Sequence, residues 1–187
     1  MSTNTREAGS KTAVSDRNAL SEPCVMLIFG ASGDLTKRLL VPSLYNLACD
    51  GLLSENFAVL GTGRSQISNE EFRDSMASKD NGLGAFHTRN EFDQAASDDL
   101  LGRFYFEPSN LELDDFKKLK TSVEQLDKQY QANGNVLFYF AMAPRFFGTL
   151  CELLYEAGFQ QGEGWKRIIV EKPFGTDLSS ALELNEA

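Results

Sequence analysis

Residues 24–40, CVMLIFGASGDLTKRLL, decide the fold of this chain. The continuous apolar run 24–29 predicts a strand that is buried on both faces of a parallel sheet. Gly30 and Gly33 predict a tight turn. The segment that follows predicts a helix ending at Gly51, with an apolar face formed by Leu35, Leu39, Leu40, Leu44 and Leu47.

A strand, a glycine turn and a helix in this order can seat a phosphate group. The glycines allow a ligand to approach the backbone closely, and the start of the helix offers unpaired N–H groups. The spacing G-x-x-G-D-L differs from the G-x-G-x-x-G of the standard dinucleotide fingerprint. A turn that only connects a strand to its helix is therefore the alternative interpretation.

The end of the next expected strand, Phe57–Gly61, indicates which coenzyme binds. An acidic residue at this place would bond the ribose 2′-hydroxyl of NAD. The sequence has no acid between Leu60 and Gln66, and Arg64 and Ser65 stand there instead. A guanidinium binds a 2′-phosphate through charge-assisted hydrogen bonds worth ~1.5–3 kcal/mol, so the pattern favours NADP. The alternative is a solvated arginine in a turn.

The rest of the chain alternates between helical and strand patterns. Expected helices are 68–79, which opens with a Ser68–Glu71 capping box, 114–132, which ends at Asn133-Gly134, one that starts at Pro144, and one from 177; expected strands are 103–107, 136–141 and 166–170. This alternation predicts an α/β fold with a Rossmann-like, doubly wound, mostly parallel sheet. Residues 1–22 are polar and predict a disordered tail, and residues 23–187 form one coenzyme-binding domain.

Four segments fall at the carboxyl ends of expected strands, where ligands of such sheets bind. They are Gly30–Gly33, Arg64, Ala141–Pro144 and Lys172. This coincidence predicts one shared site.

Composition narrows the function classes. The net charge of −9 disfavours nucleic acid and anionic membranes as partners, and no apolar run approaches the ~20 residues of a membrane span. Cys24, Cys49 and Cys151 lie far apart and predict core thiols in a reducing compartment, so we expect a cytoplasmic protein. The only histidine, His87, is expected at the surface, and no metal site is expected.

Four motifs in order resemble the coenzyme domain of the glucose-6-phosphate dehydrogenase family. They are FGASGDL at 29–35, GTGRS at 61–65, FYFAMAP at 138–144 and RIIVEKPFG at 167–175. The resemblance spans about residues 24–187. It implies NADP-dependent oxidation of glucose 6-phosphate to 6-phosphogluconolactone in the pentose phosphate pathway, by an enzyme that is a homo-oligomer at full length.

The resemblance also implies roles for individual residues. The coenzyme loop comprises Gly30, Ala31, Ser32, Gly33, Asp34 and Leu35. Arg64, with Ser65, meets the 2′-phosphate, and Asn110 approaches the adenine side. Ala143 and Pro144 contact the coenzyme, and Lys172 reaches both the coenzyme and the sugar phosphate.

The chain departs from the family pattern in two ways. Leu39 stands where many members have a lysine, and the family's catalytic histidine, in an H-Y-x-G-K motif, belongs to a region beyond Ala187. We therefore expect the carboxyl-terminal substrate domain to be absent and the chain alone to bind NADP without turnover, since this reaction needs a general base. The alternatives are a domain of the glucose–fructose oxidoreductase type, whose members usually begin with G-x-G-x-x-G, and a non-catalytic NADP-binding module.

Overall fold

A computed structural model describes residues 20–171 of the chain. The elements follow in the order β1 (Cys24–Phe29), a π-helix (Thr36–Leu40), α1 (Val41–Cys49), β2 (Phe57–Gly63), α2 (Asn69–Ala77), α3 (Leu83–Phe86), α4 (Gln94–Gly102), β3 (Phe104–Pro108), α5 (Leu113–Tyr130), β4 (Val136–Phe140), a 3₁₀ turn (Pro144–Phe146), α6 (Phe147–Glu156) and β5 (Lys166–Val170). Helices separate successive strands as the sequence predicts, but α3 and α4, which the sequence pattern did not predict, follow α2 before β3 begins.

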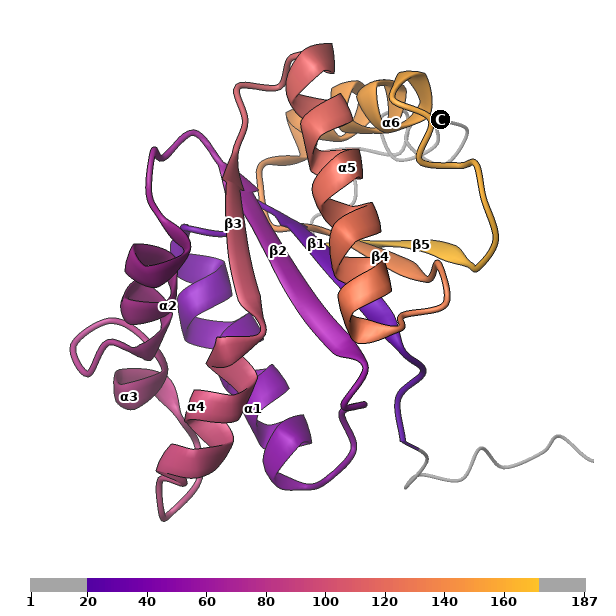
Figure 1. Ribbon diagram of the computed structural model, residues 1–187. Coiled ribbons are helices and arrows are strands. Elements are labelled where there is room, and N and C mark those ends of the chain that lie inside the picture. The colour runs from indigo at the N-terminus through magenta and orange to yellow at the C-terminus, as the bar shows by residue number, and fades with distance from the viewer. Residues whose placement is uncertain (1–19, 172–187) are drawn as a thin grey trace, which may run out of the picture.

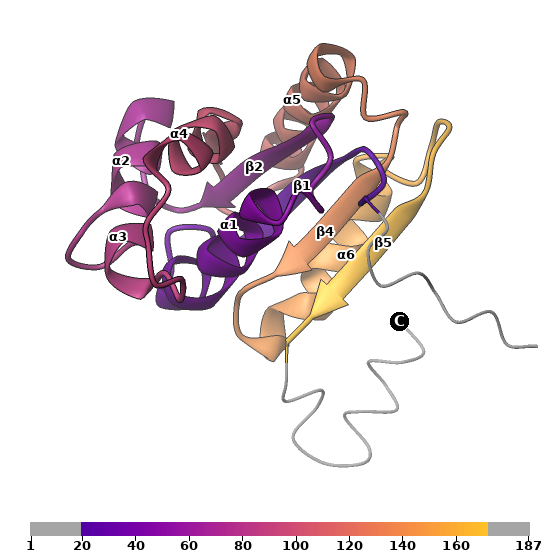
Figure 2. The ribbon, with the colours of Figure 1, turned by 90° about the horizontal axis from the view of Figure 1, so that it is seen from below.

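The five strands form one parallel sheet in the order β3-β2-β1-β4-β5. Helices α1 to α4 cover one face, and α5 and α6 cover the other (Figure 1). Figure 2 shows the arrowheads of β4 and β5 at the same end of the sheet. The predicted Rossmann-like α/β fold is confirmed.

Strand β1 is the centre of the core because both of its faces are covered. All six of its residues are buried. Met26 and Ile28 pack with the side chains of α1 to α4, whereas Val25, Leu27 and Phe29 pack with those of α5 and α6. Each such side chain contributes about 1.5–3 kcal/mol of hydrophobic stabilisation. The continuous apolar run of 24–29 is thus explained by burial on two sides.

The helix after the glycine turn differs from its predicted face. Leu35 packs against the core and Leu40 and Leu44 are buried, but Leu39 is 60% exposed and Leu47 is 40% exposed. The π-helical segment Thr36–Leu40 places one more residue in the turn. Leu35 and Leu40, five positions apart, therefore share the buried side, and Leu39 turns outward.

Other boundaries differ by a few residues. The capping box of α2 is confirmed, since Ser68 Oγ accepts the N–H of Glu71 and the Glu71 carboxylate accepts the N–H of Ser68. Helix α5 ends before the predicted Asn133-Gly134, because Gln131 already adopts a left-handed conformation (φ +53°). Its stripe of Phe116, Leu119, Val123 and Leu126 is buried as predicted.

Residues 1–19 of the predicted tail lie outside the described residues, and the tail itself stays a prediction. Ser21, which the sequence assigns to it, is held in place: its N–H donates to Leu52 O at 2.8 Å, and its hydroxyl accepts the N–H of Ser54 at 2.9 Å.

The three cysteines are free thiols, and burial raises the pKa of Cys24 to about 11. Within residues 20–171, every helix is too short or too polar to cross a membrane.

Candidate functional site

A cavity of about 740 Å³ opens at the carboxyl ends of the central strands. It is lined by Phe29, Gly30, Ser32, Gly33, Thr62, Gly63, Arg64, Ser65, Ser109, Asn110, Leu111, Ala141, Met142, Arg145 and Phe146. The strand order reverses between β1 and β4, and the loops after these two strands form the middle of the cavity. Ligands of open α/β sheets bind at this switch point.

The loop after β1 requires glycine at its first position. Gly30 has φ +82°, and a Cβ there would lie 2.6 Å from the carbonyl oxygen of Ala141. Ala141 is held in turn, because its N–H donates to Phe29 O at 2.9 Å. The loop after β1 therefore touches the loop after β4 directly, which only a residue without a side chain permits.

Several N–H groups of the glycine loop already have partners. Gly30 and Ala31 both donate to Thr62 O, at 3.0 and 3.1 Å, and Gly33 donates to Gly30 O at 3.0 Å. The helix begins directly afterwards, at Asp34 and Leu35. The N–H groups of the first helical turn have no acceptor in an earlier turn, and groups of this kind can bind an anionic ligand.

The wall beyond β2 carries the residues predicted to select the coenzyme. Arg64 and Ser65 follow the end of β2 and line the cavity together with Ser32 of the glycine loop. The hydroxyl of Ser65 donates to Ser32 Oγ at 3.4 Å. The sequence-predicted Gly30, Ser32, Gly33, Arg64 and Ser65 are thus brought to one cavity.

Asn110 also lines the cavity, and its loop is tied to the start of α5. The N–H of Asn110 donates to the Asp115 carboxylate at 2.9 Å, and the N–H of Ser109 donates to Gly63 O at 2.9 Å. The bond from Asn110, followed by that from Lys118, lowers the pKa of Asp115. Leu111 has a left-handed backbone (φ +61°), so this loop is fixed in a conformation that most side chains avoid.

We predict that Asp115→Ala destabilises the chain by about 1 kcal/mol, or roughly 2–4 °C in Tm. A lowered pKa stabilises the fold at pH values above the unfolded pKa, and this contribution is lost as pH falls through the folded pKa. Thermal unfolding should therefore show the full Tm difference near neutrality and a smaller one below about pH 4. Asp114→Ala is the control, because Asp114 lies in the same helical turn, is exposed and forms a surface ion pair with Lys117. A Tm difference that is independent of pH would contradict this role.

Five predicted residues do not line the cavity. Ala31 is fully buried, and its methyl group lies 2.7 Å from where a Cβ on Gly61 would be. Asp34 is exposed and pairs with Arg38 at 3.4 Å, and Leu35 packs against the core. Ala143 and Pro144 lie just outside, on the turn that leads to α6. Contacts of these five residues with a coenzyme stay predictions.

Sequence reasoning missed several lining residues. Thr62 is buried, and its hydroxyl donates to Glu107 O at 2.7 Å. Arg145 and Phe146 were also missed; they form the wall beyond β4 together with Met142 of the predicted Ala141–Pro144 turn. A signal for Arg145 was available, since it is a basic residue directly after the Ala141–Pro144 turn that the sequence assigns to the site.

Lys172 lies outside the described residues. Its neighbour Glu171, at the end of β5, accepts a hydrogen bond from the hydroxyl of Tyr139 on β4. Burial and this bond raise the pKa of Tyr139, which keeps its proton available to Glu171. The segment that leads to Lys172 is therefore anchored to the sheet as far as Glu171.

The charge of the cavity opposes that of the chain. The described residues that line it include two cations, Arg64 and Arg145, and no Asp or Glu.

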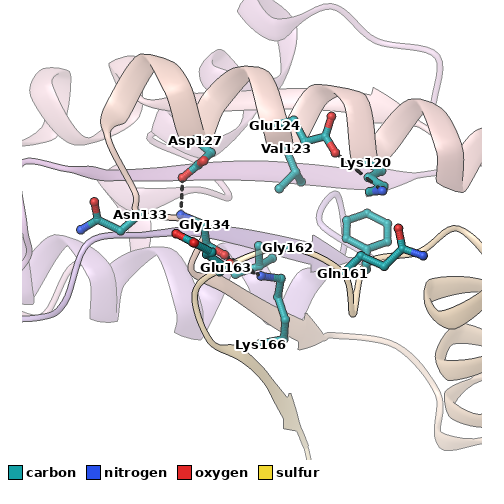
Figure 3. Close-up of a pocket in the computed structure, with 12 residues that line it drawn as sticks. Lys120, Val123, Glu124, Asp127, Asn133, Gly134, Gln161, Gly162, Glu163 and Lys166 are labelled. Atoms are coloured by element: carbon teal, nitrogen blue, oxygen red, sulfur yellow. Dashed lines mark hydrogen bonds and ion pairs between the residues drawn. The ribbon is translucent and has the colours of Figure 1, made fainter.

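A second cavity of about 410 Å³, at the amino ends of β4 and β5, is lined by residues of both charges (Figure 3). There Asp127 accepts the N–H of Gly134 at 2.7 Å, and Lys166 Nζ donates to Gly134 O at 2.7 Å. Its polar groups hold two loops together, whereas the described lining of the larger cavity has two cationic side chains and no carboxylate.

His87 lies away from the larger cavity. Its ring bonds Arg89 O through Nδ1 at 3.1 Å and lies 5.0 Å from the ring of Phe92. The adjacent Thr88 accepts a hydrogen bond from Asn46 of α1 at 2.9 Å, and His87 is not one of the residues lining the larger cavity. It is not placed to act as a base there.

Comparisons with known proteins agree with this geometry. The family model described as "Glucose-6-phosphate dehydrogenase, NAD binding domain" matches residues 27–187. The glucose-6-phosphate 1-dehydrogenase of Bacillus subtilis is 39% identical over 163 residues, which cover 87% of this chain and 32% of that protein. The enzyme of the same name from Chlamydia muridarum is 40% identical over 172 residues, which cover 88% of this chain and 33% of that protein. The chain thus spans about a third of the length of these relatives.

Solved structures give the same result. One is a glucose-6-phosphate dehydrogenase in complex with its substrate glucose-6-phosphate, with a TM-score of 0.76 and 32% identity over 90% of this chain and 34% of that one. Another is glucose-6-phosphate 1-dehydrogenase from Mycobacterium avium, with a TM-score of 0.70 and 26% identity over 88% and 33% of the two chains. The chain therefore belongs to the glucose-6-phosphate dehydrogenase family, as its NAD-binding domain.

Proposed function

We propose that this chain is the NADP-binding part of a cytoplasmic, homo-oligomeric glucose-6-phosphate dehydrogenase. The relatives are about three times as long as the matched region. Joined to a substrate domain like the one that the rest of their length would supply, this chain would oxidise glucose 6-phosphate to 6-phosphogluconolactone. The nicotinamide coenzyme, when bound, accepts the hydride from the sugar. The residues of this chain bind the coenzyme and orient it.

One observation carries the choice of NADP: the cavity presents Arg64 and Ser65 after β2, where an NAD enzyme of this fold has an acidic residue. A guanidinium there attracts the 2′-phosphate that distinguishes NADP from NAD. Gly30 gives the coenzyme's diphosphate close access to the backbone, and the first turn of the helix from Asp34 offers N–H groups. Lys172 is proposed to contact both the coenzyme and the sugar phosphate.

The test is a calorimetric titration of the 187-residue chain with NADP and NAD side by side. We expect NADP to bind at least about tenfold more tightly, which corresponds to ~1.4 kcal/mol or more. Equal affinities for NADP and NAD would contradict the proposed role of Arg64 in binding the 2′-phosphate. The absence of binding to either coenzyme would overturn the proposed function.

The same preparation tests the expectation that catalysis needs more than this chain. Mixed with NADP and glucose 6-phosphate, it should produce no reduced coenzyme, because a general base typically contributes a factor of about 10²–10⁴ in rate and His87 lies away from the cavity. Detectable reduction would show that the base lies within these residues.

A further inference from the structure

We infer that Arg145 binds the diphosphate of the coenzyme and is a second anion-binding residue, distinct in its role from Arg64. The inference rests on the proposed function, since it concerns the same cavity. Arg64 follows β2, whereas Arg145 follows β4, and the loop after β1 lies between these two strands. The two guanidinium groups therefore belong to opposite walls of one cavity.

The turn that carries Arg145 begins just after the contact between the glycine loop and the loop after β4. Gly30 and Ala141 are in direct contact, and the chain turns at Pro144–Phe146 directly afterwards. The N–H of Phe146 donates to Ala143 O at 3.0 Å and closes the turn. Arg145 is thereby held beside the loop after β1, which is where a dinucleotide of this fold places its diphosphate.

The side chain of Arg145 is also pre-organised. Its guanidinium carbon lies 4.9 Å from the centre of the Phe146 ring, a cation–π arrangement that leaves the N–H groups of the guanidinium available to an anion. Within residues 20–171 neither Arg145 nor Arg64 is paired with a carboxylate. A planar guanidinium can bond two phosphate oxygens at once, which matches a diphosphate.

The roles of the two arginines predict different coenzyme profiles. The 2′-phosphate is present only in NADP, whereas the diphosphate is shared by NADP and NAD. Loss of Arg145 should therefore weaken both coenzymes by the same factor, and loss of Arg64 should weaken NADP alone. A merely structural role of Arg145 would instead lower the thermal stability of the free chain.

The experiment titrates NADP and NAD into the 187-residue wild type, Arg145→Ala, Arg145→Lys and Phe146→Leu. We expect Arg145→Ala to weaken both coenzymes by about ten- to thirtyfold. Arg145→Lys keeps the charge but loses the planar fork, and Phe146→Leu removes the ring under the guanidinium, so both should lose about threefold. Lys117→Ala, which removes one exposed positive charge from the outer surface of α5, is the control and should bind like the wild type.

Each result decides the inference. Unchanged binding by Arg145→Ala, with an unchanged Tm and a wild type that binds, would overturn it and leave the proposed function standing. A loss confined to NADP would assign Arg145 to the 2′-phosphate and would also overturn it. A wild type that binds neither coenzyme would overturn the inference together with the proposed function.

Discussion

Gly30→Ala should abolish measurable coenzyme binding and lower the free energy of unfolding by about 2 kcal/mol or more, or roughly 4–8 °C in Tm. Two penalties combine at this position. The backbone has φ +82°, which an alanine adopts only under strain, and the added methyl carbon would lie 2.6 Å from Ala141 O. To relieve this contact, the loops after β1 and β4 would have to move apart. Because both loops line the cavity, this movement would change the shape of the coenzyme site.

Gly51→Ala is the matched control for this prediction. Gly51 also has a left-handed backbone (φ +65°), but a Cβ there would meet nothing within 4 Å, and it lies at the far end of α1. This variant should lose stability through the strain alone and should bind coenzyme like the wild type. Titration and thermal unfolding of both variants separate strain from the clash with Ala141. Wild-type coenzyme affinity in Gly30→Ala would show that the coenzyme does not use this loop.

Arg64→Ala should weaken NADP about ten- to a hundredfold and leave NAD within about twofold. Arg64 is exposed at the cavity wall, and the sequence between Leu60 and Gln66 has no acid that could bond a ribose hydroxyl in its place. The difference between the two coenzymes isolates the 2′-phosphate, because every other group of the ligands is the same. Calorimetric titration with each coenzyme measures it directly.

Arg64→Lys controls for charge in this experiment. It retains the positive charge without the bidentate fork, so its NADP affinity should lie between those of the wild type and Arg64→Ala. Equal losses for NADP and NAD in Arg64→Ala would instead place this arginine on a group that both coenzymes share. Such a result would contradict the separate roles proposed for Arg64 and Arg145.

Much of the fold follows from local patterns in the sequence. The apolar run 24–29 requires burial on both faces, and the alternation of strands with helices leads to a parallel sheet. The placement of Arg64 at the end of the second strand could also be predicted, because that strand is recognisable from the apolar residues Phe57–Gly61. The pattern missed helices α3 and α4. It also missed the outward rotation of Leu39, because the helical period of the sequence does not reveal a π-helical turn.

The sequence by itself determined the glycine turn, the place of Arg64 and the order of the strands along the chain, because each depends on residues close together in the chain. Only the tertiary structure decided which residues form one cavity. Helix α5 returns the chain across the sheet so that β4 lies beside β1, and this places Arg145 and Phe146 opposite Arg64. The same packing turns Ala31 into the core, against Gly61. These neighbours depend on strand order and on contacts across the sheet, which residue spacing does not contain.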